Sequence, residues 1–193
     1  MGFISILSFA HKLIEERTYA GDIAVDATAG NGVDTVFLAR LVGSEGTVHA
    51  FDVQRQALDS TAARVDKECP DHGPDAVRLH LRSHAELPQV LSPDEHGRVA
   101  AVMFNLGYLP GDDHATITQP ESTLSALTAS AEALRRGGII TAVLYTGHPG
   151  GAEEAEAVEQ WAAALPQKEF QVLQYRFFNQ KNHPPYLIAI EKR

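Results

Sequence analysis

A glycine-containing turn between an apolar run and a helical pattern is the first candidate for chemistry in this sequence. Residues 25–35 read Val-Asp-Ala-Thr-Ala-Gly-Asn-Gly-Val-Asp-Thr, and they begin within the apolar run Ile23–Ala27. Gly30 and Gly32 carry no side chain, so the backbone can pass close to a ligand there. In α/β sheets the crevice beyond the strand ends is the expected ligand site. A tight connection from strand to helix is the alternative explanation of the same glycines.

Asp52 is the second candidate, because it ends the next apolar run, Thr47–Phe51. An acidic side chain at this place can accept hydrogen bonds from ribose hydroxyls. The glycine-containing turn at residues 25–35 follows the acidic-x-Gly-x-Gly-x-Gly pattern of enzymes that use S-adenosylmethionine (SAM). The matching residues are Asp26, Thr28, Gly30 and Gly32, with Thr in place of the first Gly. The two signals together predict a cofactor with a ribose. Asp52 alone fits SAM, NAD or the cap of a helix.

The residues that follow the most apolar run, Val99–Phe104, could orient an amine. Asn105-Leu106-Gly107-Tyr108 has the spacing of the Asn-Pro-Pro-Tyr tetrad of methyltransferases that modify amino nitrogens. Because a methyl group moves in line from sulfonium to nucleophile, the protein's task is orientation and electrostatics. The Asn105 side-chain oxygen and the Leu106 carbonyl can accept the amine's hydrogens, and Tyr108 can stack on a base. The start of a loop beside a buried tyrosine is the alternative.

Three further polar residues have two readings each. Asp113 could hold or deprotonate a substrate amine, or it could cap the next helix. His148, in the Gly-rich segment 146–151, fits a substrate contact or a structural hydrogen bond. His84 fits a place near an adenine or a cap at the surface. The sequence has no His-Glu-x-x-His and a single Cys, so no metal site is predicted, and surface positions are expected for His72, His80 and His96.

The elements that must position these residues alternate between strand and helix. Short apolar runs predict strands at 23–27, 47–51, 76–81, 99–104, 139–145, 170–177 and 186–191. Helical spacing predicts helices within 1–17 and at 33–41, 57–67, 120–134 and 153–165, the fourth closed by Gly137 and Gly138 and the last with an acidic face. Such alternation is typical of a parallel sheet covered on both faces. The last two strands have no helix between them, so they should form an antiparallel hairpin at one edge.

This layout predicts an α/β protein with the Rossmann-like class I methyltransferase fold, a seven-stranded, mostly parallel sheet. The length of 193 residues fits one domain spanning residues 1–193, with the N-terminal helix in residues 1–20 belonging to it. A dinucleotide-binding domain would continue into a sixth parallel strand, and no second domain is available to hold a hydride acceptor. An NAD-dependent oxidoreductase and a non-catalytic nucleotide-binding module are the alternatives from other classes.

Charge and composition limit the partners. The chain has 16 Lys and Arg against 25 Asp and Glu, a net charge of −9, which argues against broad, charge-driven binding to nucleic acid. Residues 166–193 hold five basic and two acidic residues, so this end carries +3 and the remainder −12. A single Cys favours a reducing compartment, and no stretch approaches the ~20 apolar residues of a membrane span. We therefore expect a cytoplasmic protein that does not enter a membrane.

Four segments, in order, resemble the small YtqB-type methylases, a family long described as rRNA methylases: Val25–Gly32, Phe104–Gly111, Tyr145–Gly151 and Asn179–Pro185. The resemblance extends from the N-terminal helix to Pro185. It implies a SAM-dependent RNA N-methyltransferase and a homodimer. The family includes an enzyme that methylates the aminomethyl group of 5-aminomethyl-2-thiouridine at the tRNA wobble position, so tRNA is the expected partner; rRNA or a small amine is the alternative substrate.

The resemblance also implies the site residues. SAM would be bound by Asp26, Ala29, Gly30, Asn31, Gly32, Asp34, Thr35, Asp52, Gln54, His84 and Asn105. The substrate would contact Tyr108, His148, Asn179, Gln180 and Asn182, and the catalytic candidates are Asn105, Tyr108, Asp113 and His148. The sequence departs from the family pattern at Asp112 and His114, where Gly and Lys are usual, so it lacks a positive charge at that rim.

Overall fold

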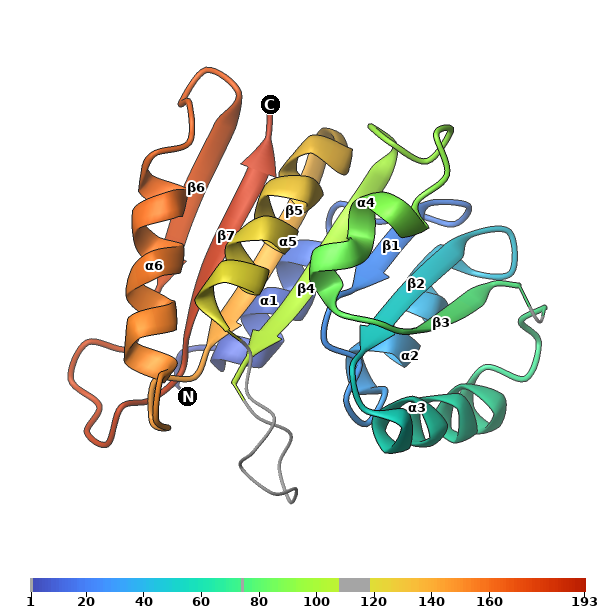
Figure 1. The fold of residues 1–193 in the computed structure, drawn as a ribbon, viewed down its shortest axis with the longest axis horizontal. Coiled ribbons are helices and arrows are strands. Elements are labelled where there is room, and N and C mark those ends of the chain that lie inside the picture. The colour runs from blue at the N-terminus through green and yellow to red at the C-terminus, as the bar shows by residue number, and fades with distance from the viewer. Residues whose placement is uncertain (1, 74, 108–118) are drawn as a thin grey trace.

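A seven-stranded sheet in the order β3-β2-β1-β4-β5-β7-β6 forms the centre of the protein (Figure 1). The computed structural model describes residues 2–73, 75–107 and 119–193. The strands are β1 Ile23–Asp26, β2 Thr47–Asp52, β3 Val77–Leu81, β4 Val99–Leu106, β5 Leu134–Leu144, β6 Phe170–Tyr175 and β7 Tyr186–Lys192. The first five pair in parallel, and β7 pairs antiparallel with both β5 and β6. The predicted mostly parallel sheet with its C-terminal hairpin is confirmed.

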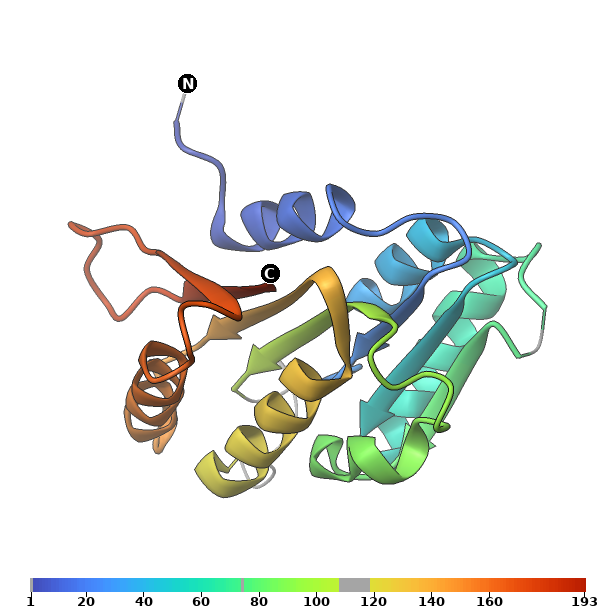
Figure 2. The same ribbon diagram turned by 90° about the horizontal axis from the view of Figure 1, so that it is seen from above.

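Helices cover both faces of this sheet, as Figure 2 shows, with α1, α2 and α3 on one side and α4, α5 and α6 on the other. Their bounds are α1 Ile6–Glu15, α2 Val33–Val42, α3 Arg55–Glu68, α4 Leu87–Val90, α5 Pro120–Ala133 and α6 Gly151–Ala163, with a 3₁₀ turn, η1, at His84–Glu86. Among the described residues, no helix has the length and apolar character that a membrane span requires.

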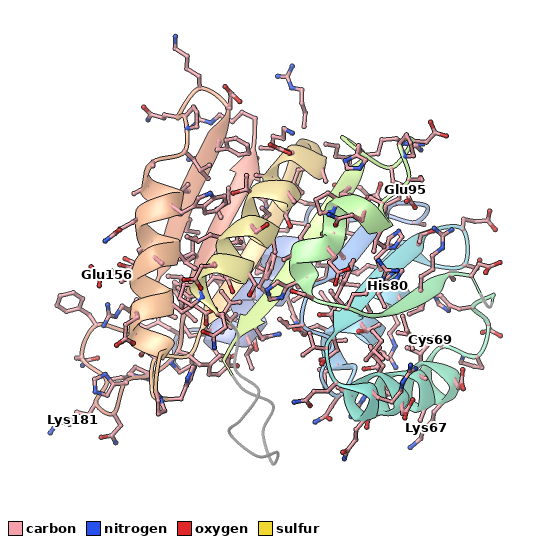
Figure 3. The ribbon with its side chains drawn as sticks, viewed as in Figure 1. Lys67, Cys69, His80, Glu95, Glu156 and Lys181 are labelled. Carbon is pink, nitrogen blue, oxygen red and sulfur yellow. The ribbon has the colours of Figure 1, made fainter. Side chains whose placement is uncertain are left out.

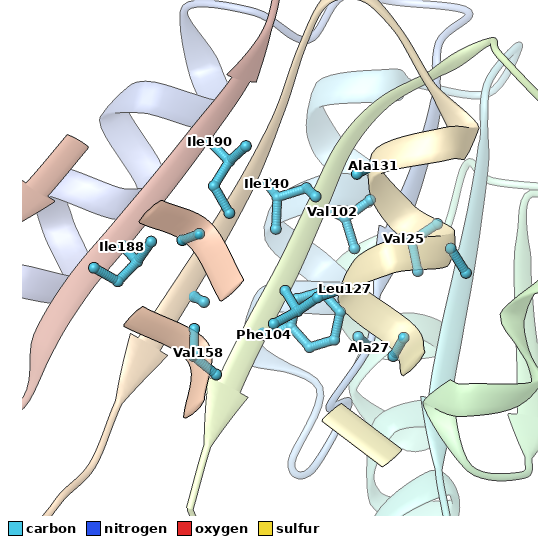
Figure 4. Close-up of a cluster of buried hydrophobic side chains, with 14 of the residues drawn as sticks. Val25, Ala27, Val102, Phe104, Leu127, Ala131, Ile140, Val158, Ile188 and Ile190 are labelled. Atoms are coloured by element: carbon cyan, nitrogen blue, oxygen red, sulfur yellow. The ribbon is translucent and has the colours of Figure 1, made fainter. Parts of the chain in front are cut away.

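Two large apolar clusters, one on each face, and a smaller one beneath α3 hold the layers together. The first joins the sheet to α4, α5 and α6, and Figure 4 shows Phe104 and Val102 of β4 against Leu127 of α5. The second joins the sheet to α1 and α2. Because β4 is buried almost throughout, its sequence is a continuous apolar run rather than an alternating one. This two-sided burial is the reason that the central strands could be located from the sequence.

The boundary between α5 and β5 differs from the prediction. The glycines expected to close the helix lie within β5 instead: Leu134 pairs with Val99 and Ile139 with Ala101, so residues 135–138 form a bulge. Lys192 of β7 performs the capping role. Its Nζ donates to the carbonyls of Ala131, Glu132 and Leu134 at 2.9–3.1 Å. A distant ammonium group thus satisfies carbonyls at the end of α5.

Two helices also depart from the expected pattern. The N-terminal helix is confined to Ile6–Glu15 and is capped by Ser5, whose hydroxyl accepts the Ser8 N–H at 3.1 Å. Phe3, which is within the predicted range 1–17, lies before the helix and is exposed. In α6, Glu154 is buried and accepts the Thr123 hydroxyl at 2.6 Å, so this acidic residue faces α5 rather than solvent.

The expected surface position of His80 is wrong. His80 is half-buried in β3, its Nε2 lies 3.1 Å from Nδ1 of the buried His49, and it packs against Phe51. Burial, followed by the charge of His49, lowers the pKa of His80 to about 4. His72 is also half-buried and donates from Nε2 to the Ala39 carbonyl, whereas His96 is exposed as predicted.

The Lys192 cap predicts a stability change. Replacing Lys192 by Met keeps an unbranched side chain of similar length but leaves three carbonyls without their donor. The free energy of unfolding should therefore fall by about 1–3 kcal/mol. Urea denaturation followed by circular dichroism measures the change. Lys168→Met is the matched control, since Lys168 is exposed. Equal stability of the two variants would contradict the capping role.

Candidate active site

The turn after β1 requires glycine at one position in particular. Gly30 and Gly32 have φ of 52° and 77°, in the left-handed region. A Cβ on Gly32 would also lie 2.9 Å from the backbone of Thr61. The Thr61 hydroxyl donates to the Gly30 carbonyl at 3.1 Å, and Arg64 donates to the carbonyl of the exposed Asn31 at 2.7 Å. α3 therefore holds the turn in shape from one side.

Asp52 holds the same turn from the other side. Its Oδ2 accepts the Gly30 N–H and its Oδ1 accepts the Gln54 N–H, both at 2.9 Å. Ala29, which is buried, donates its N–H to the carbonyl of Phe51. α3 begins at Arg55 without a side-chain cap, so Asp52 joins the ends of two strands rather than capping the helix. Each carboxylate oxygen keeps a lone pair for a further donor.

Two buried acceptor atoms lie on residues that the sequence assigned to the cofactor. His84 is buried, which corrects the surface alternative, and burial lowers its pKa, so the ring is neutral at pH 7. Because a carbonyl can only accept, Nδ1 donates to Ala27 at 3.1 Å and Nε2 bears a lone pair. This Nε2 and the Oε1 of Gln54 are buried without a hydrogen-bond partner among the described residues. Both would be satisfied by donors on a ligand.

A cluster of polar groups joins the ends of β1 and β4 to the start of α2. Asp26 is fully buried; its Oδ1 accepts the Thr28 N–H at 3.1 Å and its Oδ2 the Thr35 hydroxyl at 2.6 Å. The neighbouring Asp34 accepts from Asn105 at 2.6 Å. Burial, and then the charge of Asp34, raise the pKa of Asp26 from 3.8 to about 7. At neutral pH the Asp26 carboxyl is therefore partly protonated.

Asn105 is fixed in one orientation by this cluster. Its backbone N–H donates to the Thr28 hydroxyl at 2.8 Å, and its Nδ2 donates to Oδ2 of Asp34. Since a carboxylate only accepts, the amide must turn its nitrogen toward Asp34, which leaves Oδ1 to accept from another group. The adjacent Leu106 carbonyl already accepts the Tyr145 N–H at 3.0 Å and has one lone pair left.

His148 is buried beside the end of β4. Its Nδ1 donates to the Pro149 carbonyl at 3.0 Å, the structural bond that the sequence offered as one alternative. A Cβ on Gly151 would lie 2.8 Å from Nε2 of His148, and one on Gly107 would lie 3.5 Å from the same atom. These glycines therefore make room for the imidazole next to the residues after Asn105. Contact of His148 with a substrate stays a prediction.

The residues expected on the substrate side are only partly brought together. Asn179, Gln180 and Asn182 are exposed on the connection between β6 and β7, at the sheet edge where β4 and β5 end (Figure 1). This connection passes close to the segment after β5, since a Cβ placed on Gly147 would lie 3.9 Å from the carbonyl oxygen of His183. Figure 3 shows Lys181 directed away from the sheet. The predicted residues Tyr108 and Asp113, with Asp112 and His114, lie outside the described residues.

Sequence reasoning missed two residues of this site. His11 of α1 lies 2.6 Å from Oδ1 of Asp34 through its Nε2. Tyr145 follows β5 and is half-buried; burial and the charge of Asp34 raise the pKa of its hydroxyl. The amphipathic spacing around His11 located its helix but carried no signal of the partner. In the described part of the chain, no three His, Cys, Asp or Glu residues gather as a metal site would require.

Comparison with known proteins identifies the family to which this chain belongs. A family model described as "Putative rRNA methylase" matches residues 48–191. The chain belongs to the rRNA methylase family. Among its relatives is a chloroplastic tRNA (mnm5s2U34)-methyltransferase of Arabidopsis thaliana, which is 37% identical over 189 residues, or 95% of this chain and 68% of that one.

Solved structures support the same family and fold. A crystal structure from Clostridium thermocellum, described as a "putative rRNA-methylase", is 41% identical to this chain. The match covers both chains completely, with a TM-score of 0.93. A "putative methyltransferase" of Streptococcus mutans in complex with SAH is 36% identical over both full chains, with a TM-score of 0.88. A Thermotoga maritima SAM-dependent O-methyltransferase at 19% identity and a TM-score of 0.66 shares the fold alone. The predicted class I methyltransferase fold of this methylase is confirmed.

The raised pKa of Asp26 predicts a pH-dependent contribution to stability. The folded protein holds this proton more tightly than the unfolded chain, so the stabilisation is fully present below pH 3.8 and is lost as the pH rises through about 7. The histidines with lowered pKa change stability in the opposite direction, so the comparison must be with a variant. Asp26→Asn keeps a neutral group and should gain stability relative to wild type as the pH rises from 4 to 8.

Urea denaturation at several pH values measures this difference in unfolding free energy. Asp59→Asn is the control, because Asp59 is exposed on α3. A constant difference between Asp26→Asn and wild type across the range would contradict the raised pKa.

Proposed function

We propose that this protein is a SAM-dependent tRNA methyltransferase that methylates the aminomethyl nitrogen of 5-aminomethyl-2-thiouridine at the wobble position. The observation that carries the proposal is the fixed amide of Asn105, whose Oδ1 is left to accept a hydrogen from an amine at the end of β4. The activity for which the Arabidopsis relative is named supports the choice of this nucleoside. Membership of a methylase family favours this reading over an oxidoreductase or a non-catalytic nucleotide-binding module.

The residues around the turn after β1 suit SAM. The cofactor, when bound, supplies a methyl group on a sulfonium centre. Asp52 has a lone pair on each oxygen for ribose hydroxyls. The buried acceptors Nε2 of His84 and Oε1 of Gln54 would receive donors from the nucleoside. The remaining residues proposed for this site are Asp26, Ala29, Gly30, Asn31, Gly32, Asp34 and Thr35. The S. mutans structure in complex with SAH supports this assignment.

Asn105 would prepare the amine for attack. A protonated amine has no lone pair, so the substrate must reach the site in its neutral form. Oδ1 of Asn105 and the remaining lone pair of the Leu106 carbonyl would each accept one N–H, which directs the nitrogen lone pair at the methyl group. Tyr108, Asp113 and His148 remain proposed members of the catalytic group.

The connection between β6 and β7 would contact the RNA. Phe178 is 100% exposed at this connection, which also carries Arg176 and Lys181. An exposed aromatic ring beside cationic side chains is the arrangement by which proteins bind unpaired nucleotides. We assign Asn179, Gln180 and Asn182 to the same contact. The homodimer and the cytoplasmic location stay proposals; the Arabidopsis relative is chloroplastic.

The first test transfers a labelled methyl group from SAM to tRNA that carries 5-aminomethyl-2-thiouridine. Wild type should label the wobble nucleoside, and Asn105→Ala should lower kcat about 100-fold, because the amine loses its orientation. Gln171→Ala, at an exposed position of β6, is the control and should retain wild-type kcat. Label in rRNA or in a free amine, with none in the tRNA, would contradict the proposed substrate.

The second test addresses the RNA contact. Loss of one stacked base costs ~1.4 kcal/mol, so Phe178→Ala should raise the KM for tRNA about tenfold and leave the KM for SAM unchanged. Val172→Ala serves as the control, because Val172 is an exposed apolar residue on β6, away from the connection that carries Phe178. An unchanged KM for tRNA in the Phe178 variant would remove this ring from the interface.

A further inference from the structure

The carboxylate of Asp34 connects the N-terminal helix to the residue that faces the substrate. Its Oδ1 lies 2.6 Å from Nε2 of His11, and its Oδ2 lies 2.6 Å from Nδ2 of Asn105. The three residues come from α1, α2 and β4, elements that are far apart in the sequence. Asp34 itself is buried, so these two donors replace the water that would otherwise solvate its charge.

The chemistry of this contact fixes the state of His11. A carboxylate offers no hydrogen, so Nε2 of His11 must carry the proton in the bond to Asp34. The ring is also held in place from its face, because it stacks on Phe37 of α2 with centroids 4.0 Å apart and planes 7° apart. His11 therefore donates from Nε2 to Asp34 with its ring held in a single orientation.

We propose that His11 is a positioning residue for methyl transfer, acting through Asp34 on the amide of Asn105. This inference rests on the proposed function. Each carboxylate oxygen of Asp34 accepts one of these hydrogen bonds, so the carboxylate is held in one orientation and Oδ2 stays directed at Asn105. Without His11 the carboxylate can rotate about its side-chain bonds, and the Asn105 amide rotates with it. The Oδ1 of Asn105 then spends less time aimed at the substrate amine.

The helix that carries His11 is anchored by other contacts. Tyr175 of β6 donates its hydroxyl to the Ile4 carbonyl at 3.0 Å and packs against Phe9. At the other end, Arg17 donates to Glu191 of β7 at 2.7 Å. Ile6, Ala10 and Ile14 are buried against the sheet. Loss of the His11 imidazole therefore should not release α1, and an effect on catalysis can be separated from an effect on folding.

Kinetics of two His11 variants test the proposal. His11→Ala should lower kcat about tenfold with little change in the KM for tRNA, since it acts on orientation and not on RNA binding. His11→Gln should recover most of the rate, because the Gln side-chain nitrogen can donate to Asp34 from a similar position. His96→Ala, at an exposed site, is the control and should match wild type. A kcat for His11→Ala equal to that of wild type would overturn the proposal.

A double-mutant cycle distinguishes positioning from packing. If His11 acts only through Asn105, then His11→Ala should cause no further loss of kcat in the Asn105→Ala background. Two independent losses that multiply would overturn the proposal, as would equal damage by His11→Ala and His11→Gln accompanied by equal falls in melting temperature.

A readout without substrate keeps this inference separate from the proposed function. In the free protein with ¹⁵N-labelled histidine, nuclear magnetic resonance should find the proton on Nε2 of His11. A neutral ring with its proton on Nδ1 alone would overturn the contact with Asp34. Wild-type protein that shows the Nε2 proton but labels no tRNA would reject the proposed function, whereas active wild type with an equally active His11→Ala variant would reject only the role of His11.

Discussion

The buried carboxylate of Asp34 is the constraint on which the site depends. A charge removed from water is costly unless hydrogen bonds satisfy it, and here the donors come from α1 and β4. These two hydrogen bonds join the first helix, the start of α2 and the end of β4. Burial, and then the same charge, raise the pKa of the neighbouring Asp26 to about 7. The apolar layers bring the strand ends close together, and the polar interactions there set the orientation of the side chains in the site.

Two halves of the site differ in their chemistry. Around Asp52 the buried groups that have no partner within the described part of the chain are acceptors, on Gln54 and on a neutral His84, which suits the donors of a nucleoside. Around Asn105 the arrangement leaves a single amide oxygen and one carbonyl lone pair, which suits the hydrogens of an amine. The hydroxyl of Thr28 connects the halves, because it follows β1 and accepts the backbone N–H of Asn105. The Thr that interrupts the expected glycine pattern therefore has a specific structural use.

The sequence predicted the strands and the glycine turn well, because buried parallel strands are continuous apolar runs and the turn needs glycine. Features that depend on distant partners were not predictable. Arg135–Gly138 looks like the end of a helix but forms a bulge, and the cap of that helix comes from Lys192, 58 residues beyond Leu134. η1 and α4 were missed because each is shorter than two helical turns and Pro88 interrupts the pattern. The role of His11 could not be seen from its helix, since amphipathic spacing gives a face and not a partner.

The acidic composition is consistent with a small RNA contact rather than a broad one. Two basic residues of the C-terminal segment, Arg176 and Lys181, are on the same connection as the exposed ring of Phe178, at the end of the sheet where the candidate site lies. The most direct measurement of the central claim is the nucleoside profile of tRNA from cells that lack this protein. If this protein methylates the wobble nucleoside, 5-aminomethyl-2-thiouridine should accumulate in these cells while its methylated product disappears, and the wild-type gene should restore the product. An unchanged profile would rule out methylation of this nucleoside by the protein.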